Sequence, residues 1–424
     1  MGIALIIIFF VLMLIGFPVV ISIAIPSIIY VFAYGIPIEL ISLRLQYALD
    51  SYPLMAIPVF IYAGNLMNNT GITDRIFKFA DLSVGRIPGG MAQVNIFAGL
   101  LFSGMSGAAL AAVGGLGPVT IKSMEAKGFK KSFAAAITIS SATIGPIFPP
   151  SIPLIIYGAV ASVSIVKLLL AGIVPALVIV VMLMVTTVII SIRNNYPRAK
   201  KWPSLKMLVK GFISVAPALG SLLVLIGGLL SGFFTPTEAA VVMVAYIIIV
   251  NLLVYRNLTL SHLVKAAHQT IRTSVSILII ISVASLFGWI LAVEQIPQIF
   301  ANNVLLLTTN PTYLLIIVNI MLLIVGMFLD STTATLLVVP IIASPLVSAG
   351  IDPIHLGVVT ILNLMVGLMT PPLGLSLFLV SNIANIPVNE VLKAVLPFLI
   401  PLLVTLIMVT FLPSMSLWIP NMLK

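Results

Sequence analysis

Long apolar stretches, separated by short clusters of charged residues and by Pro/Gly breaks, run along the whole chain. Most of them reach the ~20 residues that an α-helix needs to cross the hydrocarbon core of a bilayer. Cut at the clusters and breaks, the first half yields predicted segments at 2–20, 22–43, 53–70, 92–121, 132–160 and 168–191. The second half yields segments at 211–232, 236–254, 273–293, 313–349, 355–382 and 394–412. The pattern predicts an all-α polytopic membrane protein.

Composition supports a lipid environment. Of the residues, 61% are hydrophobic and 7% charged, whereas a soluble domain carries ~25% charged residues. The chain has no cysteine, which excludes disulfides and cysteine-ligated metal sites. The net charge of +10 comes mainly from a few clusters of basic residues, which lack the interleaved aromatic and polar faces of a nucleic-acid-binding surface, so we expect no nucleic acid. Basic loops stay cytoplasmic, and the main clusters are 75–86, 122–131, 193–210 and 256–272.

The two halves repeat each other. When one half slides over the other by 222 positions, glycines and prolines coincide rather than generic apolar residues. The coincident pairs are Gly104 with Gly326, Pro118 with Pro340, Gly128 with Gly350, Gly145 with Gly367, Pro149-Pro150 with Pro371-Pro372 and Pro175 with Pro397. A tandem double proline in register argues against chance, so we predict an internal structural repeat.

Charges predict the orientation of this repeat. Segment 92–121 is flanked by Arg86 and by Lys122, so both its ends belong in the cytoplasm and the segment forms a re-entrant hairpin. Its partner 313–349 has no adjacent Lys or Arg and should enter from outside. Equivalent hairpins from opposite faces make an inverted repeat, which is typical of secondary transporters with a site at the membrane midplane.

Each half also carries a proline-broken apolar segment. These are "IGPIFPPSIP" (144–153) and "VGLMTPPLGL" (366–375). Proline lacks the N–H that a helix interior needs, and non-helical backbone at membrane depth is tolerated only beside protein or a water-filled cavity. We therefore predict two discontinuous helices. Their free carbonyls suit a small cation, and the half-helix that follows each break presents a partially positive N-terminus to an anion.

The predicted hairpin tips carry hydroxyl and carboxylate groups, which are hard oxygen donors that suit Na⁺ better than a transition metal. No Lys or Arg is expected at the depth of the breaks, so a bound cation would supply the charge for an anionic substrate. The predicted Na⁺-binding residues are Ser103, Gly104, Ser106, Gly145, Asp330, Ser331, Thr332, Thr333, Gly367 and Thr370. The predicted substrate-binding residues are Ser106, Pro149, Pro150, Ser151, Pro371 and Pro372. No catalytic residue, cofactor or transition metal is predicted.

Several of these polar residues also have a purely structural interpretation. In this interpretation, Asp330 and Ser331 cap a helix and bind no ion. The hydroxyls of Ser140, Ser141 and Thr143 could bond back to the preceding helical turn. Glu238 is interpreted as a helix-start carboxylate. The stretches 74–86 and 256–272 are predicted to be amphipathic arms on the membrane surface.

The paired motifs "SG-S-A" at the first tip, "IGPIFPPS" and "LDSTTAT…P…TPPLG" resemble the large membrane subunit of TRAP transporters, the DctM-like family of the ion-transporter superfamily. The resemblance covers essentially the whole chain. It departs at Met105, where a second serine is frequent, and in the apolar "AALAA" run, where an acidic residue is often found. These departures bear on the ion contacts of the first hairpin.

The resemblance implies Na⁺-coupled import of small organic acids, such as C4-dicarboxylates, sugar acids or sialic acid, across the bacterial inner membrane. It implies two partners, a small four-span membrane subunit and a periplasmic substrate-binding protein. It also implies an elevator mechanism. The corresponding parts are scaffold helices and first arm at 1–92, the first transport repeat at 93–191, a basic loop, scaffold helices and second arm at 192–312, and the second transport repeat at 313–424.

Two alternatives remain at this point. A single-chain Na⁺/dicarboxylate carrier of the same superfamily would need no binding protein. An intramembrane serine protease would match "GMSG" (104–107), but its serine needs a general base, and His262, His268 and His355 fall in loops or at segment ends.

Overall fold

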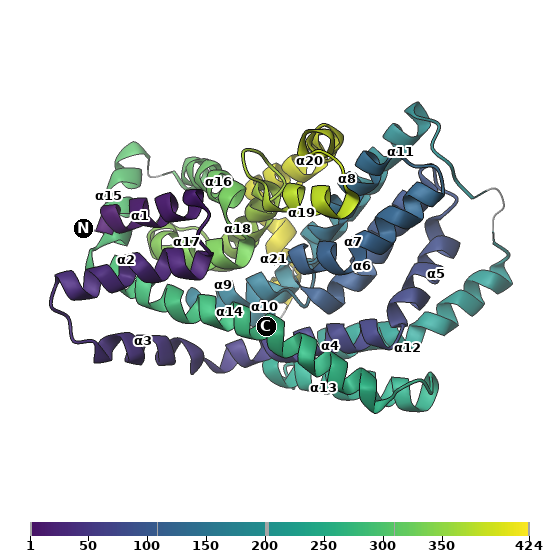
Figure 1. Ribbon diagram of the computed structural model, residues 1–424, viewed down its shortest axis with the longest axis horizontal. Helices are drawn as coiled ribbons and strands as arrows, with labels where there is room; N and C mark the ends of the chain where they lie inside the picture. The colour runs from purple at the N-terminus through teal and green to yellow at the C-terminus, as the bar shows by residue number, and fades with distance from the viewer. Residues whose placement is uncertain (1, 108, 200–202, 309, 423–424) are drawn as a thin grey trace.

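The computed structural model is built from α-helices packed side by side (Figure 1), and it describes residues 2–107, 109–199, 203–308 and 310–422. The helices of the first half are α1 (Gly2–Ile15), α2 (Val19–Ala33), α3 (Glu39–Leu49), η1 (Tyr52–Met55), α4 (Ala56–Asn69), α5 (Ile72–Val84), α6 (Gly90–Ser106), α7 (Ala109–Ala126), α8 (Lys131–Ala142), α9 (Ile152–Val160), α10 (Ile165–Ala171) and α11 (Ile173–Arg193). Those of the second half are α12 (Leu205–Leu230), α13 (Pro236–Ile249), η2 (Val250–Val254), α14 (Leu260–Val293), α15 (Ile296–Leu307), α16 (Pro311–Phe328), α17 (Ser331–Ser348), α18 (Pro353–Gly367), α19 (Leu375–Ala384), α20 (Val388–Phe411) and α21 (Ser414–Met422).

The described part of the chain contains 7 helices that are long and apolar enough to cross a membrane. They cover Ile165–Arg193, Leu205–Leu230, Pro236–Val254, Leu260–Val293, Pro311–Phe328, Ser331–Ser348 and Val388–Phe411. Shorter apolar helices, including α18 and α19, fill the regions that the prolines interrupt. The chain is therefore an all-helical multi-span membrane protein, as its hydropathy predicts.

The structure confirms the repeat in the order and the bounds of its helices. Shifting α7 (Ala109–Ala126) by 222 positions gives 331–348, which are the bounds of α17. The same shift brings α6 within one residue of α16 and superposes the starts of α8 and α18. Both broken segments therefore stand at the same place after a helical hairpin.

Equivalent turns end the second helix of each hairpin. Gly128 and Gly350 adopt left-handed backbone conformations, with φ of 91° and 92°, which a glycine tolerates because it has no Cβ. After α7 the amide of Phe129 donates to the carbonyl of Met124 at 3.1 Å, and after α17 the amide of Ile351 donates to that of Leu346 at 3.1 Å. These are the same helix-terminating turns, so the sequence match extends to local backbone geometry.

The predicted second arm at 256–272 is wrong. Thr259 caps α14, which then runs without interruption from Leu260–Val293, so the supposed arm and the predicted span 273–293 are one helix. The 222-residue shift matches α14 with α3 and α4 together. In the first half of the chain, η1 with Pro53 lies between these two helices. The same shift matches α5, the first arm, with α15. By the repeat, the helix that corresponds to the predicted first arm is α15.

The predicted span 22–43 is too long, because α2 ends at Ala33 and a new helix, α3, begins at Glu39 after Gly35 and Pro37.

The carboxylate of Glu294 ties the N-terminal helices to the end of α14. The hydroxyl of Tyr30 and the amide of Gly2 donate to the two carboxylate oxygens of Glu294, at 2.8 and 2.9 Å. These hydrogen bonds hold the pKa of Glu294 below its ordinary value; the bond from Tyr30 is the larger cause and the bond from Gly2 the next.

The two repeats interlock at the centre of the molecule. Helix α7 of the first hairpin packs against α19, which follows the second break, and α17 of the second hairpin packs against α9, which follows the first break. At the first of these contacts a Cβ on Gly117 would lie 3.5 Å from the Ile383 side chain. The phenol of Tyr157, on α9, donates to the carbonyl of Pro353 at 3.1 Å. These cross-contacts place both breaks in one core.

Candidate functional site

The first break lies between α8 and α9, and its backbone is wholly buried. Ser151 caps α9 by accepting a hydrogen bond from the amide of Leu154 at 3.2 Å, and its own hydroxyl donates to the carbonyl of Pro146. A predicted substrate-binding hydroxyl is thus engaged by its own loop. The Pro149–Pro150 and Pro371–Pro372 peptide bonds are both cis. Gly145 is buried at the start of this loop.

The second break lies between α18 and α19 and is more open. Pro371 and Pro372 are exposed, whereas Pro149 and Pro150 are buried. The hydroxyl of Thr370 bonds back to the carbonyl of Val366 at 2.7 Å. Within the described residues, the carbonyls of Thr370, Pro371 and Pro372 accept no hydrogen bond from a backbone amide. This loop therefore has carbonyl oxygens that are free of backbone hydrogen bonds, and their predicted role in ion binding stays a prediction.

Each hairpin tip lies against the break of its own repeat. In the first repeat, Gly107 has a left-handed φ of 58°, and a Cβ on it would lie 2.8 Å from the carbonyl oxygen of Pro150. In the second, the amide of Gly374 donates to the carbonyl of Met327 at 3.0 Å. A Cβ on Gly367 would lie 2.7 Å from the backbone of Gly326, so these two glycines let α18 and α16 touch directly. Only glycine permits such an approach.

Asp330 occupies the tip of the second hairpin, between α16 and α17. It caps α17, because its carboxylate accepts from the amides of Thr332 and Thr333 at 2.9 and 3.3 Å. The hydroxyl of Thr333 donates to the other carboxylate oxygen at 2.5 Å. Ser331, Thr332 and Thr333 are buried while Asp330 is half-buried. The capping interpretation is confirmed, and it leaves the carboxylate partly accessible to a cation.

The first hairpin tip carries the remaining predicted residues. The backbone of Ser103, Gly104 and Ser106 forms the last turn of α6. The side chains of residues 103–106 lie outside the described part of the structure, so their proposed ion contacts stay predictions. Gly107 directly follows them in the chain, and it places this tip against the first break.

The other hydroxyls with an open structural interpretation have backbone partners. Ser140 donates to the carbonyl of Ala136 at 2.7 Å, Ser141 to that of Thr138 at 3.1 Å and Thr143 to that of Ser140 at 2.7 Å. Glu238 forms a capping box with Thr235 at the start of α13. These four residues therefore support helix geometry, and the helix-start interpretation of Glu238 is confirmed.

Two amide networks were missed by the sequence analysis. Asn363, buried on α18, donates to the carbonyl of Asn319 at 2.9 Å and to its side-chain oxygen at 2.6 Å. Asn95, buried on α6, donates to the hydroxyl of Thr138 on α8 at 3.2 Å. An amide inside an otherwise apolar helix was the available signal, because such a group must find a partner when buried. Both networks join a hairpin to the broken helix beside it.

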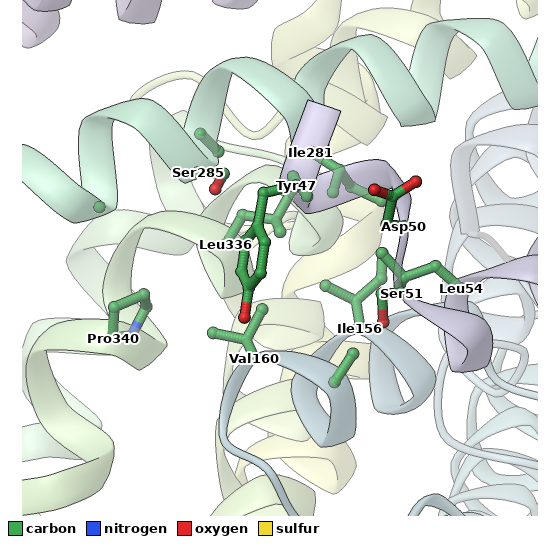
Figure 2. Close-up of a pocket in the computed structure, with 14 residues that line it drawn as sticks. Tyr47, Asp50, Ser51, Leu54, Ile156, Val160, Ile281, Ser285, Leu336 and Pro340 are labelled. Carbon is green, nitrogen blue, oxygen red and sulfur yellow. The ribbon is translucent and has the colours of Figure 1, made fainter. Parts of the chain in front are cut away.

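A cavity of ≈ 460 Å³ separates α3, η1 and α14 from α9 and α17 (Figure 2). The ring of Tyr47 projects into it, and Leu336 and Pro340 of the second hairpin form part of the opposite wall. Its polar groups include the carboxylate of Asp50 and the hydroxyls of Ser51 and Ser285, and none of the described residues that line it is Lys or Arg.

A second cavity, of ≈ 360 Å³, lies on the same boundary beside the first hairpin. It is enclosed by α4 and α14 on one side and by Phe102, Ala112 and Ile152 on the other. Arg272 lines it together with Asn65, Asn68 and Gln269. The sequence analysis assigned Arg272 to a surface arm and expected no cation near the breaks. Because α14 is continuous, Arg272 instead lines the cavity that borders the start of α9.

The chain matches the family described as "Tripartite ATP-independent periplasmic transporter, DctM component" over residues 6–415. It is 42% identical over 377 residues to the sialic acid TRAP transporter large permease protein SiaM of Vibrio cholerae, covering 88% of this chain and 87% of that protein. It is 38% identical over 388 residues to the C4-dicarboxylate TRAP transporter large permease protein DctM of Pseudomonas aeruginosa, covering 90% of each. It is 33% identical to the isethionate TRAP transporter permease protein DctMQ of Oleidesulfovibrio alaskensis, covering 96% of this chain but 64% of that protein.

The fold is similar to that of a solved transporter. The crystal structure of the Alcanivorax borkumensis YdaH transporter superposes with a TM-score of 0.63 at 15% identity, over 90% of this chain and 88% of that one. The family is one of transporter components rather than enzymes, which rules out the protease alternative. The helical repeat, the paired breaks and a match over nearly the whole length agree, and this chain belongs to the DctM family, the large permease component of TRAP transporters.

Proposed function

We propose that this permease imports a small organic acid across the bacterial inner membrane, driven by a Na⁺ gradient. The observation that carries the proposal is the match over residues 6–415 to a transporter family. Relatives at 42%, 38% and 32% identity are named for sialic acid, C4-dicarboxylates and 2,3-diketo-L-gulonate. All three are organic acids, so an anion is the substrate class that these relatives share.

The oxygen donors at the second hairpin support Na⁺ as the coupling ion. The Asp330 carboxylate is half-buried, and Thr370 with its two prolines offers free carbonyls in the adjacent loop. Carboxylate and carbonyl oxygens suit hard cations. In this proposal Na⁺ is held by Asp330, Thr370 and Gly367 in the second repeat and by Ser103, Gly104, Ser106 and Gly145 in the first. Ser331, Thr332 and Thr333 shape the tip around Asp330.

The substrate anion is proposed to bind between the two breaks, against the half-helix N-termini after Pro149-Pro150 and Pro371-Pro372. Ser106 and Ser151 belong to this predicted site, although Ser151 also caps α9. Arg272 lines the cavity next to Ile152, and its positive charge attracts an anion to the boundary between the two proposed domains. This role for Arg272 adds to the residues that the sequence predicts.

An elevator motion is proposed along the boundary that holds the two cavities. Residues 93–191 and 313–424 form the moving transport domain, and residues 1–92 with 192–312 form the scaffold. The cavities of ≈ 460 and ≈ 360 Å³ leave this boundary less tightly packed than the interlocked helices of the two repeats. Loose packing at one surface and dense packing behind it favour sliding of a rigid unit.

The proposed inverted topology predicts opposite accessibility for the two hairpins. A cysteine at Lys127 should react with a membrane-impermeant maleimide only from the cytoplasmic side, and a cysteine at Ala349 only from outside. The chain has no native cysteine, so labelling reports the introduced residue alone. The two positions follow α7 and α17, whose bounds correspond in the repeat. Labelling of both from the same side would exclude the inverted arrangement.

The proposed partners are a small four-span membrane subunit and a periplasmic substrate-binding protein. The relative named DctMQ is longer than this chain, which covers 64% of it, and this supports a second membrane component. We expect purified permease in liposomes with an inward Na⁺ gradient to take up no substrate by itself. Radiolabelled sialic acid, succinate or a sugar acid should accumulate only after both partners are added.

The same liposomes distinguish the alternatives. Omitting the binding protein, or dissipating the Na⁺ gradient with an ionophore, should abolish accumulation. Uptake by the permease alone under a Na⁺ gradient would instead identify a single-chain Na⁺/dicarboxylate carrier. Uptake that is independent of Na⁺ in the complete system would overturn the proposed coupling.

A further inference from the structure

A separate cavity of ≈ 690 Å³ lies between α5, the first half of α12 and the segment after η2. None of the residues predicted to bind the ion or the substrate lines it. Its wall includes Arg75 and Lys78 from α5 and Lys210 from α12, with Asp74 as the one carboxylate. The cavity therefore has an excess of positive charge that transport through the breaks does not use.

The cationic groups of this cavity are available to a ligand. Among the described residues, Lys78, Lys210 and Asp74 form no ion pair, and both lysines are exposed. Arg75 is held in place, because its guanidinium donates to the hydroxyl of Ser214 at 3.3 Å and lies 4.3 Å from the centre of the Tyr255 ring. A fixed guanidinium with two mobile ammonium groups is an arrangement that suits a phosphate.

Asn257 lies on the side of the cavity that follows η2. Its side-chain nitrogen donates to the carbonyl of Thr70 at 2.6 Å, which ties this segment to the turn before α5. The wall of the cavity is therefore held together beside Arg75 by a hydrogen bond between distant parts of the chain.

The rim of the cavity is apolar and continues onto a lipid-facing helix. Phe79, Leu82 and Met207 line the cavity beside the charged groups. Farther along α12, Ile213 is 64% exposed within a helix long enough to span the membrane. The basic clusters place this end of α12 at the cytoplasmic interface. Charged groups and an acyl-binding surface therefore meet at the depth of the lipid headgroups.

We propose that this cavity binds the headgroup of an anionic phospholipid. The phosphate lies among Arg75, Lys78 and Lys210, and the acyl chains lie against α12. Basic pockets between helices on the cytoplasmic side recognise anionic lipids in this way. The bound lipid joins α5, which leads into the first hairpin, to the scaffold helix α12.

Native mass spectrometry of the detergent-purified chain tests the proposal with phosphatidylglycerol, phosphatidylcholine and soluble glycerol 3-phosphate as probes. We expect retention of phosphatidylglycerol in preference to the other two. The double variant Lys78→Gln/Lys210→Gln should lower phosphatidylglycerol affinity about 30-fold, since each basic residue contributes about fivefold at an anionic surface. Arg75 is left unchanged because its contacts also hold α5 in place.

The double variant Lys122→Gln/Lys130→Gln is the matched control. It removes two exposed lysines near the ends of α7 and α8, outside this cavity, and should leave lipid affinity unchanged. Equal loss in both lysine pairs would overturn the proposal. Binding of glycerol 3-phosphate as tight as that of the lipid would also overturn it.

Discussion

Replacing Asp330 by asparagine should raise the Na⁺ concentration for half-maximal uptake about tenfold or more, which corresponds to a loss of about 1.4 kcal/mol of binding free energy. Asparagine still caps a helix, so α17 should form normally. It removes the negative charge of a half-buried carboxylate in the repeat whose break carries the free carbonyls of residues 370–372. The measurement is initial uptake of the transported acid by the complete reconstituted system over a range of Na⁺ concentrations.

Asp352→Asn is the matched control for this variant. Asp352 caps α18 in the same manner, accepting from the amides of Ile354 and His355 at 2.8 and 3.0 Å. It lies at the turn between α17 and α18 rather than at the hairpin tip. Its replacement should leave the Na⁺ dependence as in the wild type. An unchanged Na⁺ dependence in Asp330→Asn would show that Asp330 is a helix cap only.

Replacing Gly172 by alanine should destabilise the protein and abolish transport. Gly172 joins α10 to α11, and a Cβ at this position would overlap the carbonyl oxygen of Ile147 in the first break. The obstacle is backbone, which cannot rotate away as a side chain does. Overpacking of this kind costs about 1–3 kcal/mol. We expect a lower thermal transition in detergent and loss of uptake, because the loop must move away from its buried position.

Gly227→Ala is the control for this variant, and we expect it not to destabilise the protein. Gly227 lies inside α12, and nothing stands within 4 Å of its Cβ position. Alanine is the better helix former by about 1 kcal/mol, so this variant should be as stable as the wild type or slightly more stable. If Gly172→Ala unfolds at the same temperature as Gly227→Ala and still transports, the close packing of the first break is not required.

Much of the architecture follows from the sequence alone. The 222-residue register of Gly104, Gly145 and the paired prolines predicts two hairpins and two broken helices, and the bounds of α7 and α17 agree with it. Glycine and proline specify backbone locally, through the missing Cβ and the missing N–H. For that reason their positions report breaks and turns without knowledge of the neighbouring helices. The capping role of Asp330 could also be predicted, because a helix cap is a local contact between a side chain and the backbone amides two and three residues later.

Contacts between distant segments were decided by the tertiary structure. The change from the basic stretch 256–272 to the apolar residues after it did not distinguish a separate arm from the first turns of α14, and the outcome placed Arg272 at a cavity beside Ile152. Each hairpin packs against the helix after the other repeat's break, α7 on α19 and α17 on α9. These contacts, like that of Gly326 with Gly367, depend on which helices meet. In a chain that is apolar on nearly every face, hydrophobicity does not select partners. Shape and buried polar groups such as Asn319 and Asn363 do, and both act only once the helices are assembled.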